Sequence, residues 1–422
     1  MPTRAAASPQ PSTGERRDAS ADVLISGGGL VGQVLALALA RHGLTSIMVD
    51  PADPIASLAP HFDGRASAIA SAPWKMLQAI GLGDALRAHG CPIERIWVSD
   101  GLQPGEIDFA PAGDEPLGVM FENRQLRRAL AEGVAACDAI DLRAPARTAH
   151  IERGPNRVTL TLADGSRLSA PLIAVCEGRG SATRDAAAIP LARWSYHHGA
   201  MIGAFAHAES HENVAYEIFY PSGPFAILPL NDLPDGRHRS AFVWSVDESD
   251  APAYMRLGPR GYRAELLRLM GGILGEVEEI APRALFPLSF QRATQITAER
   301  MALVGDSAHA IHPIAGQGFN LGLRDVAALV EILVDGARLG MDLGDAQLLE
   351  RYSRWRGLDN LSVAAATDIL TRLFGVPGKG ASLLRRAGMA GVQKLHPLKG
   401  FFMDEARGEG GDLPKLLSGA LV

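Results

Sequence analysis

The sequence predicts an α/β protein with a Rossmann-like domain, a second, mainly antiparallel β domain, and a helical C-terminal region. Residues 22–50 combine a buried strand, a glycine-rich turn, a helix and a second strand, which together form a βαβ unit. Residues 196–247 contain short runs in which apolar residues alternate, as they do in half-buried antiparallel strands. From about residue 345 onward, apolar residues recur at helical spacing.

The predicted domains are discontinuous along the chain. Residues 1–20 are rich in Ala, Ser, Pro and Arg without apolar periodicity, so we expect a disordered tail there. The Rossmann-like domain is assigned to residues 21–92, 121–190 and 286–340. The second domain is assigned to residues 93–120 and 191–285, and the helical region to residues 341–422.

The first βαβ unit is the clearest local pattern. Residues 22–26 form a short apolar run typical of a buried strand. Val31, Val34, Leu35 and Ala38 then fall on one face of a helix, and a second strand follows at residues 46–50.

The glycine cluster of this unit has the spacing Gly27-x-Gly29-x-x-Gly32. In such a turn one glycine permits the tight bend, one lets the backbone approach a pyrophosphate, and one allows close packing of helix on strand. The helix N-terminus offers N–H groups and partial positive charge to the phosphates. Asp50 ends the second strand 18 residues after Gly32, where an acid can bind ribose hydroxyls. The unit therefore predicts dinucleotide binding, without saying which dinucleotide.

Further elements follow along the chain. The pattern indicates helix over residues 67–90 and 123–136, and short strands near 93–99 and 106–109. Residues 157–168 form a hairpin around Asp164-Gly165. Buried strands are expected at residues 171–176 and 301–304, and a long helix around residues 326–333.

Composition excludes several classes of protein. Glycine accounts for 46 of 422 residues, about 11% against a typical ~7%, but without the period of three that collagen requires. The excess glycines therefore indicate turns and close backbone approaches. The net charge of −6 argues against a protein that binds nucleic acid through broad phosphate neutralisation.

The cysteines and the apolar segments indicate the cellular compartment of the protein. Cys91, Cys137 and Cys176 are odd in number and widely spaced, which favours neither a disulfide framework nor a zinc site and indicates a reducing compartment. The apolar stretch from Val23 to Ala40 is interrupted by polar residues and three glycines, so it is a poor membrane span. We expect a cytoplasmic protein.

A second motif extends from Gly305 to Gly322, between a strand and a helix. It reads Gly-Asp-Ser-Ala-His-Ala-Ile-His-Pro-Ile-Ala-Gly-Gln-Gly-Phe-Asn-Leu-Gly. This run resembles the second FAD-binding motif of the group A flavoprotein aromatic hydroxylases, which share the fold of para-hydroxybenzoate hydroxylase. The resemblance implies that Asp306 binds the flavin ribityl chain. It also implies a flavin-ring environment made of Pro313, Gly316, Gln317 and Gly318.

Shorter segments extend the resemblance over most of the chain. Asp63-Gly64-Arg65 and Glu122-Asn123-Arg124 are similar to segments in which the arginine approaches FAD. Glu177-Gly178 resembles the family's Asp-Gly motif near the FAD and NAD(P)H pyrophosphates, with Glu in place of the usual Asp. The implied cofactor-binding set is Gly27, Gly29, Leu30, Val31, Gly32, Asp50, Arg65, Arg124, Glu177, Gly305, Asp306, Pro313, Gly316, Gly318 and Asn320.

Within this family, Tyr216-Glu217 and the run from Pro221 to Leu230 resemble the ubiquinone-biosynthesis hydroxylases. That likeness implies hydroxylation of the ring of a polyprenylated phenol through a C4a-hydroperoxyflavin, with FAD as cofactor, O2 as co-substrate, and NAD(P)H or another reductant. His198 and Tyr216 are candidate substrate-side residues by location.

Alternative interpretations stay open at this point. The chain could be an FAD monooxygenase for another aromatic or polyketide substrate, or a flavin-binding assembly factor of a quinone-biosynthesis complex. His309 and His312 lack a third ligand pattern, so no metal site is expected. Basic residues stand among apolar ones over residues 380–402, which is compatible with peripheral contact at the inner face of the cytoplasmic membrane. Other ubiquinone-biosynthesis proteins are expected as partners.

Overall fold

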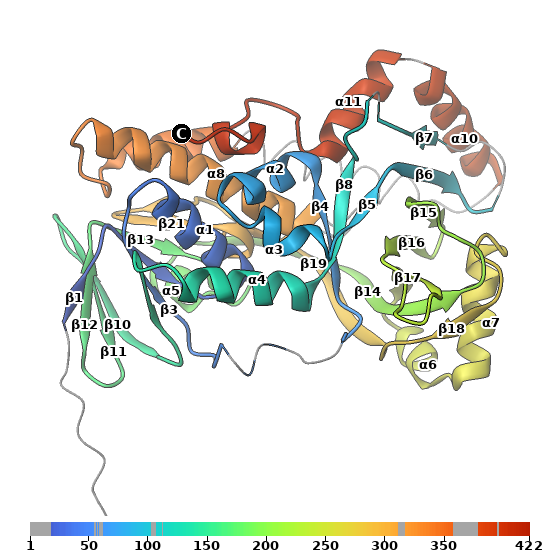
Figure 1. Cartoon of the computed structure of the whole chain (residues 1–422), viewed down its shortest axis with the longest axis horizontal. Coiled ribbons are helices and arrows are strands. Elements are labelled where there is room, and N and C mark those ends of the chain that lie inside the picture. The colour runs from blue at the N-terminus through green and yellow to red at the C-terminus, as the bar shows by residue number, and fades with distance from the viewer. Residues whose placement is uncertain are drawn as a thin grey trace, which may run out of the picture.

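The structure is a computed structural model that describes residues 18–54, 56, 58, 62–102, 107–111, 113–310, 317–357, 379–394 and 396–422. It confirms the predicted α/β class, with a Rossmann-like sheet beside a larger, mainly antiparallel sheet (Figure 1). Most of the expected tail lies outside the described residues. Its last two residues, Ala19–Ser20, form strand β1 and pair in parallel with β12 (Arg167–Ala170), so the boundary expected at residue 20 is wrong there.

The Rossmann-like sheet has the strand order β20-β21-β13-β2-β3-β9. The strands are β2 (Val23–Ser26), β3 (Ser46–Val49), β9 (Ile140–Arg143), β13 (Leu172–Val175), β20 (Thr297–Ala298) and β21 (Met301–Leu303). All neighbouring pairs are parallel except β20 with β21. The carboxyl ends of β2, β13 and β21 therefore meet at one edge, which is where open α/β sheets bind their ligands.

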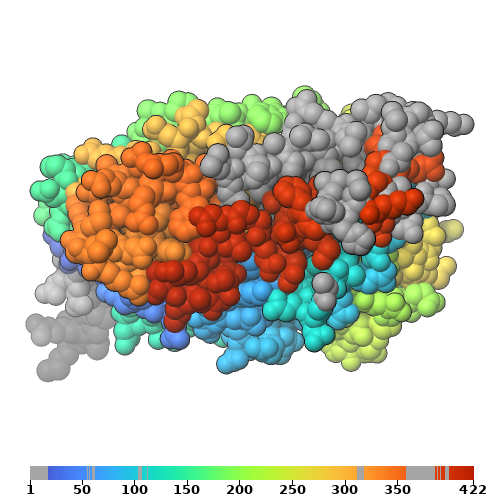
Figure 2. Space-filling model, turned by 90° about the horizontal axis from the view of Figure 1, so that it is seen from above, coloured from blue at the N-terminus to red at the C-terminus, as the bar shows by residue number. Residues whose placement is uncertain are grey.

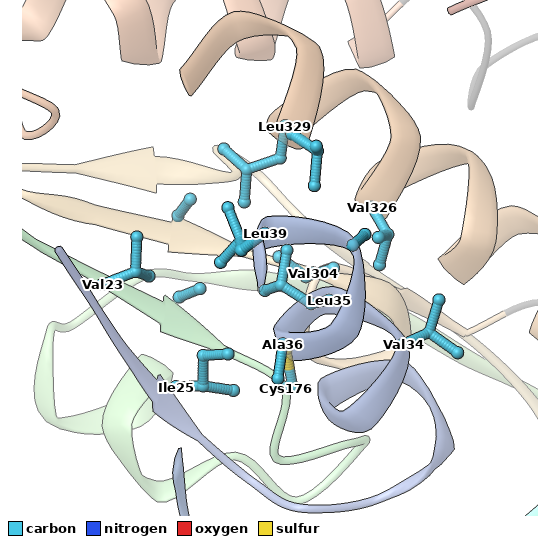
Figure 3. Packing of buried hydrophobic residues seen from close by; sticks show 14 of the residues in the cluster. Val23, Ile25, Val34, Leu35, Ala36, Leu39, Cys176, Val304, Val326 and Leu329 are labelled. Carbon is cyan, nitrogen blue, oxygen red and sulfur yellow. The ribbon is translucent and has the colours of Figure 1, made fainter. Parts of the chain in front are cut away.

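Helices cover this sheet and bury its apolar residues. The helices are α1 (Leu30–Arg41), α4 (Asn123–Ala135) and α8 (Gln317–Arg338). Figure 3 shows side chains of β2, α1 and α8 meeting around α1, where Leu35 and Val326 are fully buried. This core fixes the start of α1 relative to the strand ends, because close-packed interiors resist displacement.

Two smaller sheets flank the Rossmann-like sheet. One has the order β1-β12-β11-β10 and contains the predicted hairpin, which β11 (Val158–Leu162) forms with β12, while β10 (Thr148–Arg153) pairs with the other edge of β11. The other has the order β4-β8-β5, with β4 (Ala66–Ala70), β8 (Gly118–Glu122) and β5 (Cys91–Ile93).

The helix predicted over residues 67–90 is wrong in its first part. Ala66–Ala70 form strand β4, which pairs with β8, and only then do α2 (Ser71–Ala79) and α3 (Gly83–Arg87) follow. Alanine-rich sequence favours helix locally, but pairing with β8 overrides that weak preference.

The larger sheet has the strand order β22-β19-β14-β17-β16-β15-β6-β7, and β18 pairs with β14. Its strands are β6 (Arg95–Asp100), β7 (Ile107–Phe109), β14 (Leu191–His207), β15 (Val214–Tyr220), β16 (Gly223–Leu230), β17 (His238–Asp247), β18 (Val277–Glu279), β19 (Ala284–Ala293) and β22 (His309–Ala310). All pairs are antiparallel except β6 with β15. The domain boundary predicted at residue 286 falls inside β19, and the domain division stays a prediction.

Helices lie on both sides of this sheet (Figure 1). On one side are α6 (Ala251–Arg256) and α7 (Pro259–Met270), and on the other are α10 (Lys379–Lys394) and α11 (His396–Arg407). The described part of the C-terminal region also contains a helix over residues 346–357 and a short 3-10 helix at Lys415–Ser418. Figure 2 shows these C-terminal elements, in orange and red, spread over one face of the molecule. Within the described residues, no helix combines the length and apolarity needed to cross a bilayer.

Candidate active site

The three motif glycines have the backbone geometry that their predicted roles require. Gly27 has a φ of 107°, which permits the tight bend after β2. A Cβ on Gly32 would collide with the carbonyl oxygen of Gly27, so this glycine allows α1 to pack onto the turn. A Cβ on Gly29 would meet nothing within 4 Å, so open space lies in front of this backbone. Gly29 is therefore the position where a phosphate group can approach.

The N-terminus of α1 is available to an anion. Gly29 is the N-cap, with extended backbone and no side-chain cap, and the first intrahelical bond runs from the Gln33 N–H to the Gly29 carbonyl. The N–H groups of the first turn therefore have no partner within the helix. Val31 contributes its backbone here, because its side chain packs against Gly305 and Gly322. Leu30 likewise packs its side chain on the core.

Asp50 lies beside this turn, as the sequence predicts. Its Oδ2 accepts a hydrogen bond of 2.6 Å from the Gly28 N–H, and its Oδ1 accepts one of 2.7 Å from the Ala52 N–H. Each carboxylate oxygen can accept a second hydrogen bond. Asp50 is thus held rigidly at the end of β3 and keeps capacity for ribose hydroxyls.

The second motif begins at the carboxyl end of β21 and lies beside the first. Asp306 belongs to a 3-10 turn, η1 (Gly305–Ser307), and the Gly178 N–H donates to Ser307 Oγ at 3.1 Å. The segments after β13 and β21 are thereby tied together at the edge where Gly29 lies. Cβ atoms on Gly178 and Gly180 would also meet nothing within 4 Å.

The carboxyl group of Asp306 is surrounded by protein on most sides but stays accessible to solvent. Its side chain is 42% exposed, and Arg179 Nε lies 3.5 Å from its Oδ2. Desolvation by the surrounding protein nevertheless raises the pKa of Asp306, and the positive charge of Arg179 opposes this shift. A partly exposed carboxyl group at this depth is well placed to accept hydrogen bonds from the hydroxyls of a bound cofactor.

A buried ion network beneath this motif is not predictable from the sequence pattern. Asp325 of α8 is fully buried and accepts hydrogen bonds from His309 Nε2 at 2.6 Å, Arg356 Nε at 2.7 Å and the Gly305 N–H at 2.9 Å. Burial alone would raise the pKa of Asp325, but the charges of His309 and Arg356 lower it to about 2. The network fixes η1, and hence Asp306, onto α8. Asp325 lies three residues after the motif, and no local sequence pattern points to Arg356.

Glu177 makes its contacts inside the protein. Its carboxylate accepts hydrogen bonds from Ser26 Oγ at 2.5 Å, Ser181 Oγ at 2.6 Å and the Thr183 N–H at 3.0 Å. Burial raises the pKa of Glu177, but these hydrogen bonds outweigh it and the net shift is downward. The carboxylate thus joins the end of β2 to the start of helix α5 (Ala182–Ala186). This geometry positions the neighbouring Gly178, and a direct contact of Glu177 with FAD stays a prediction.

The two predicted arginines are each held by a neighbouring acid. Arg65 donates to Asp63, and the pKa of Asp63 is lowered because these hydrogen bonds outweigh its partial burial. Arg124 pairs with the buried Glu122, which also accepts a hydrogen bond of 2.6 Å from Arg239. Both guanidinium groups are thus oriented by local carboxylates.

The start of α8 is described only in part. Pro313 and Gly316 lie outside the described residues. Gln317 begins α8, but its side chain also lies outside the described part of the structure. A Cβ on Gly318 would meet nothing within 4 Å. The side chain of Asn320 is hydrogen-bonded to the backbone of β4. Its Nδ2 donates to the Ala68 carbonyl at 2.9 Å, and its Oδ1 accepts from the Ala70 N–H at 3.0 Å.

The two predicted substrate-side residues are not brought together. His198 lies at a bulge of β14, where its Nδ1 is 2.7 Å from the Tyr196 carbonyl oxygen. Tyr216 lies on β15, three strands away, which is about 14 Å at ~4.8 Å per strand. Its ring packs edge-on against Trp97, on the sheet face that α6 and α7 cover. Tyr216 therefore faces away from the described cofactor-binding residues.

The described residues fit a flavin dinucleotide. Open backbone at Gly29, Gly178, Gly180 and Gly318 marks where a Cβ would intrude on a ligand. These positions, together with Asp50 and Asp306, come from separate segments of the chain. The helix N-terminus suits the pyrophosphate, and the two acids suit ribose and ribityl hydroxyls.

Comparison with known proteins indicates the same cofactor. The model of the FAD binding domain family matches residues 20–361. Ubiquinone hydroxylase UbiL of Rhodospirillum rubrum is 42% identical over 406 residues, which are 95% of this chain and 94% of that protein. The 3-demethoxyubiquinol 3-hydroxylase of Escherichia coli is 32% identical, covering 90% of this chain and 96% of that protein.

Solved structures agree on the fold. The crystal structure of p-nitrophenol 4-monooxygenase PnpA from Pseudomonas putida superposes with a TM-score of 0.76 over 94% of this chain and 100% of that one, at 18% identity. That likeness shows the fold alone. Since the family model and both relatives match most of the chain, this protein belongs to the FAD binding domain family and is an FAD-dependent monooxygenase.

Proposed function

We propose that this monooxygenase hydroxylates the aromatic ring of a polyprenylated phenol in ubiquinone biosynthesis, using O2 and NAD(P)H. The observation that carries the proposal is the similarity, over nearly the whole chain, to proteins named ubiquinone hydroxylase and 3-demethoxyubiquinol 3-hydroxylase. The match covers more than nine-tenths of the Rhodospirillum rubrum relative, so it includes the larger sheet as well as the FAD-binding segments.

The chain's own residues would divide the work as follows. The turn at Gly29 and the start of α1 would hold the pyrophosphate, Asp50 the ribose, and Asp306 the ribityl chain. Once bound, FAD supplies the redox and oxygen chemistry that no protein side chain can perform. The protein contributes binding, orientation and exclusion of water from the reacting ring. The network around Asp325 holds Asp306 in place for this task.

Turnover by the purified protein tests the proposal. The protein is expected to carry oxidised flavin and to oxidise NAD(P)H faster when a phenol with an apolar ortho chain, such as 2-geranylphenol, is added. Mass spectrometry should detect a product that has gained one oxygen atom. If no such product forms and a deletion strain still makes ubiquinone, the proposed function is wrong.

Asp306→Ala is expected to weaken FAD binding by about 10- to 100-fold, because a hydrogen bond to a charged group contributes ~1.5–3 kcal/mol. Flavin absorbance per protein, followed during dialysis, measures the loss. Asp404→Ala is the matched control, because Asp404 is an exposed carboxylate on α11. Full flavin occupancy in Asp306→Ala would refute the ribityl role.

We also propose that α11 contacts the inner face of the cytoplasmic membrane peripherally. Phe401 is 59% exposed on this helix, and Lys394 is exposed nearby at the end of α10. Arg385 takes no part in such contact, because it is buried against Asp100 at 3.0 Å. An exposed aromatic residue and an exposed cation close to it in the sequence suit the boundary between headgroups and acyl chains.

Phe401→Ser is expected to reduce binding to vesicles of phosphatidylglycerol and phosphatidylethanolamine by about tenfold, since burying a phenylalanine contributes ~1.5–3 kcal/mol. Co-sedimentation measures the bound fraction. Leu339→Ser removes another exposed apolar side chain, 75% exposed after the end of α8, and should leave binding unchanged. Equal losses in both variants would contradict a specific role for α11.

A further inference from the structure

The two faces of the larger sheet pack into two separate apolar clusters. On the face toward α6 and α7, Met201, Phe225, Phe242 and Trp244 are all 2% exposed or less. On the opposite face, side chains such as Val98, Ile202, Leu228 and Val243 keep accessible surface, although they lie in the middle of the sheet. The second face therefore carries partly accessible apolar side chains beside buried ones such as Ala226 and Ala241.

Glu217 is the acidic residue in the centre of that face. The strand register places it opposite Val98 on one side and Ala226 on the other, and Val243 and Ile202 continue the same row across β17 and β14. Among the described residues, no side chain or backbone group forms a hydrogen bond or ion pair with its carboxyl group. The side chain also keeps some accessible surface. This carboxyl group thus lies among apolar side chains without a partner in the described part of the protein.

Neighbouring charges do not explain why an acidic side chain stands at position 217. Asp100 of β6 is paired with Arg385 of α10, and Arg239 of β17 is paired with Glu122 of β8. Asp100 and Arg239 lie on the same side of the sheet as Glu217, and each forms an ion pair with the partner just named. Burial alone raises the pKa of Glu217 to about 7, and no neighbouring charge contributes to the shift. A carboxyl group in such surroundings is costly to the fold, and such groups cluster at functional sites.

This face adjoins the start of α8. Ala66 and Ala68 of β4 pack in the same apolar cluster as Ala215 and Phe219, the neighbours of Glu217 on its side of β15. The backbone of the same β4 is bonded to the side chain of Asn320, in the first turn of α8. The residues around Glu217 and those around Gly318 are therefore joined through a single strand.

We propose that Glu217 binds the phenolic hydroxyl of the substrate and accepts its proton, an inference that rests on the proposed function. The phenol O–H bond breaks, the proton passes to a carboxylate oxygen of Glu217, and the electron pair stays on the phenolic oxygen. The ring becomes more electron-rich and therefore more readily hydroxylated. The apolar row on either side of Glu217 would hold the ring and its hydrocarbon chain. A carboxyl group with a raised pKa is a stronger base toward a phenol than an ordinary carboxylate.

Glu217→Gln tests the assignment, because it keeps the shape of the side chain and removes the base. With 2-geranylphenol and saturating NAD(P)H, the variant should form hydroxylated product about 100-fold more slowly, the usual size of a general-base contribution. The wild-type rate should rise with pH through about 7, and the variant should lose this step. Tyr216→Phe is the matched control on the same strand, since Tyr216 faces α6 and α7. Its pH profile should match that of the wild type.

Thermal unfolding provides a second measurement that does not depend on turnover. A carboxyl group whose pKa is raised on folding destabilises the protein as pH rises above the pKa of the unfolded chain. Glu217→Gln should therefore have a higher melting temperature than the wild type at pH 8, and this difference should shrink toward zero as pH falls to about 4. Flavin content should be unchanged, because Glu217 is not in the cofactor-binding set.

The outcomes separate this inference from the proposed function. If the wild type forms no hydroxylated phenol, the proposed function fails. If the wild type is active and Glu217→Gln keeps its rate within threefold and its pH profile unchanged, Glu217 is not the base. A slower variant with a lower melting temperature at pH 8 would also overturn the assignment, because it would indicate a structural role.

Discussion

A Gly29→Val variant is expected to fold normally and to purify without FAD. Gly29 has a φ of −70° and extended backbone, which valine adopts without strain, and its Cβ would meet no protein atom within 4 Å. The side chain would instead fill the space through which a pyrophosphate reaches the N–H groups of α1. Losing two hydrogen bonds to a charged group, at ~1.5–3 kcal/mol each, corresponds to at least about a 100-fold weaker affinity. Flavin absorbance and circular dichroism measure the two effects separately.

Gly258 offers a matched control for this experiment. It is also a helix N-cap, before α7, with a φ of −68° and extended backbone, and a Cβ added there would meet nothing within 4 Å. Gly258→Val should therefore keep both the fold and the flavin. Normal cofactor content in Gly29→Val would remove the pyrophosphate role, and loss of flavin in both variants would show that the substitution itself is disruptive.

Asp325→Asn is expected to lower the free energy of unfolding by about 3–5 kcal/mol, the usual cost of breaking a buried ion pair from one side. The substitution leaves the guanidinium of Arg356, which is 2% exposed, without the counter-charge of Asp325. Urea denaturation of the flavin-free proteins measures the difference without a contribution from bound cofactor. Glu350→Gln breaks the exposed pair with Arg354 and should cost about 0.5 kcal/mol or less.

The free energy of unfolding of the wild type relative to this variant should depend on pH in a definite direction. The pKa of Asp325 is lowered on folding, from 3.8 to about 2, so its charge stabilises the folded state above the unfolded pKa. This contribution is lost as pH falls from about 4 toward 2. The stability difference between wild type and Asp325→Asn should thus shrink as pH falls below about 4. A difference that stays constant at low pH would contradict the assignment of the charge to Asp325.

The parts of the site that sequence predicts are those whose geometry is local. Gly27, Gly29 and Gly32 lie within six residues, so their spacing alone predicts which one bends the chain, which one has open space in front of it and which one packs. Asp306 is predictable for a similar reason, because it closely follows a buried strand.

The parts that sequence does not predict depend on contacts between distant segments. Arg356 meets Asp325 only because the helix over residues 346–357 packs beside α8. The side chain of Asn320 is hydrogen-bonded to the backbone of β4. The local sequence of β4 favours a helix, so this contact cannot be predicted from the sequence. Tyr216 and Glu217 are adjacent in sequence, but only the covering of one sheet face by α6 and α7 shows which of them lies on the opposite face.

Strand β19 has a consequence for how this protein can be divided. It pairs with β14 along the larger sheet, and its last residues pair with β22, which closely follows η1. The larger sheet is thus completed by residues that belong to the flavin motif. A fragment that contains residues 191–285 alone would lack this edge and expose unpaired backbone. The flavin motif and the larger sheet therefore share a strand pairing, which a division of the chain between them would break.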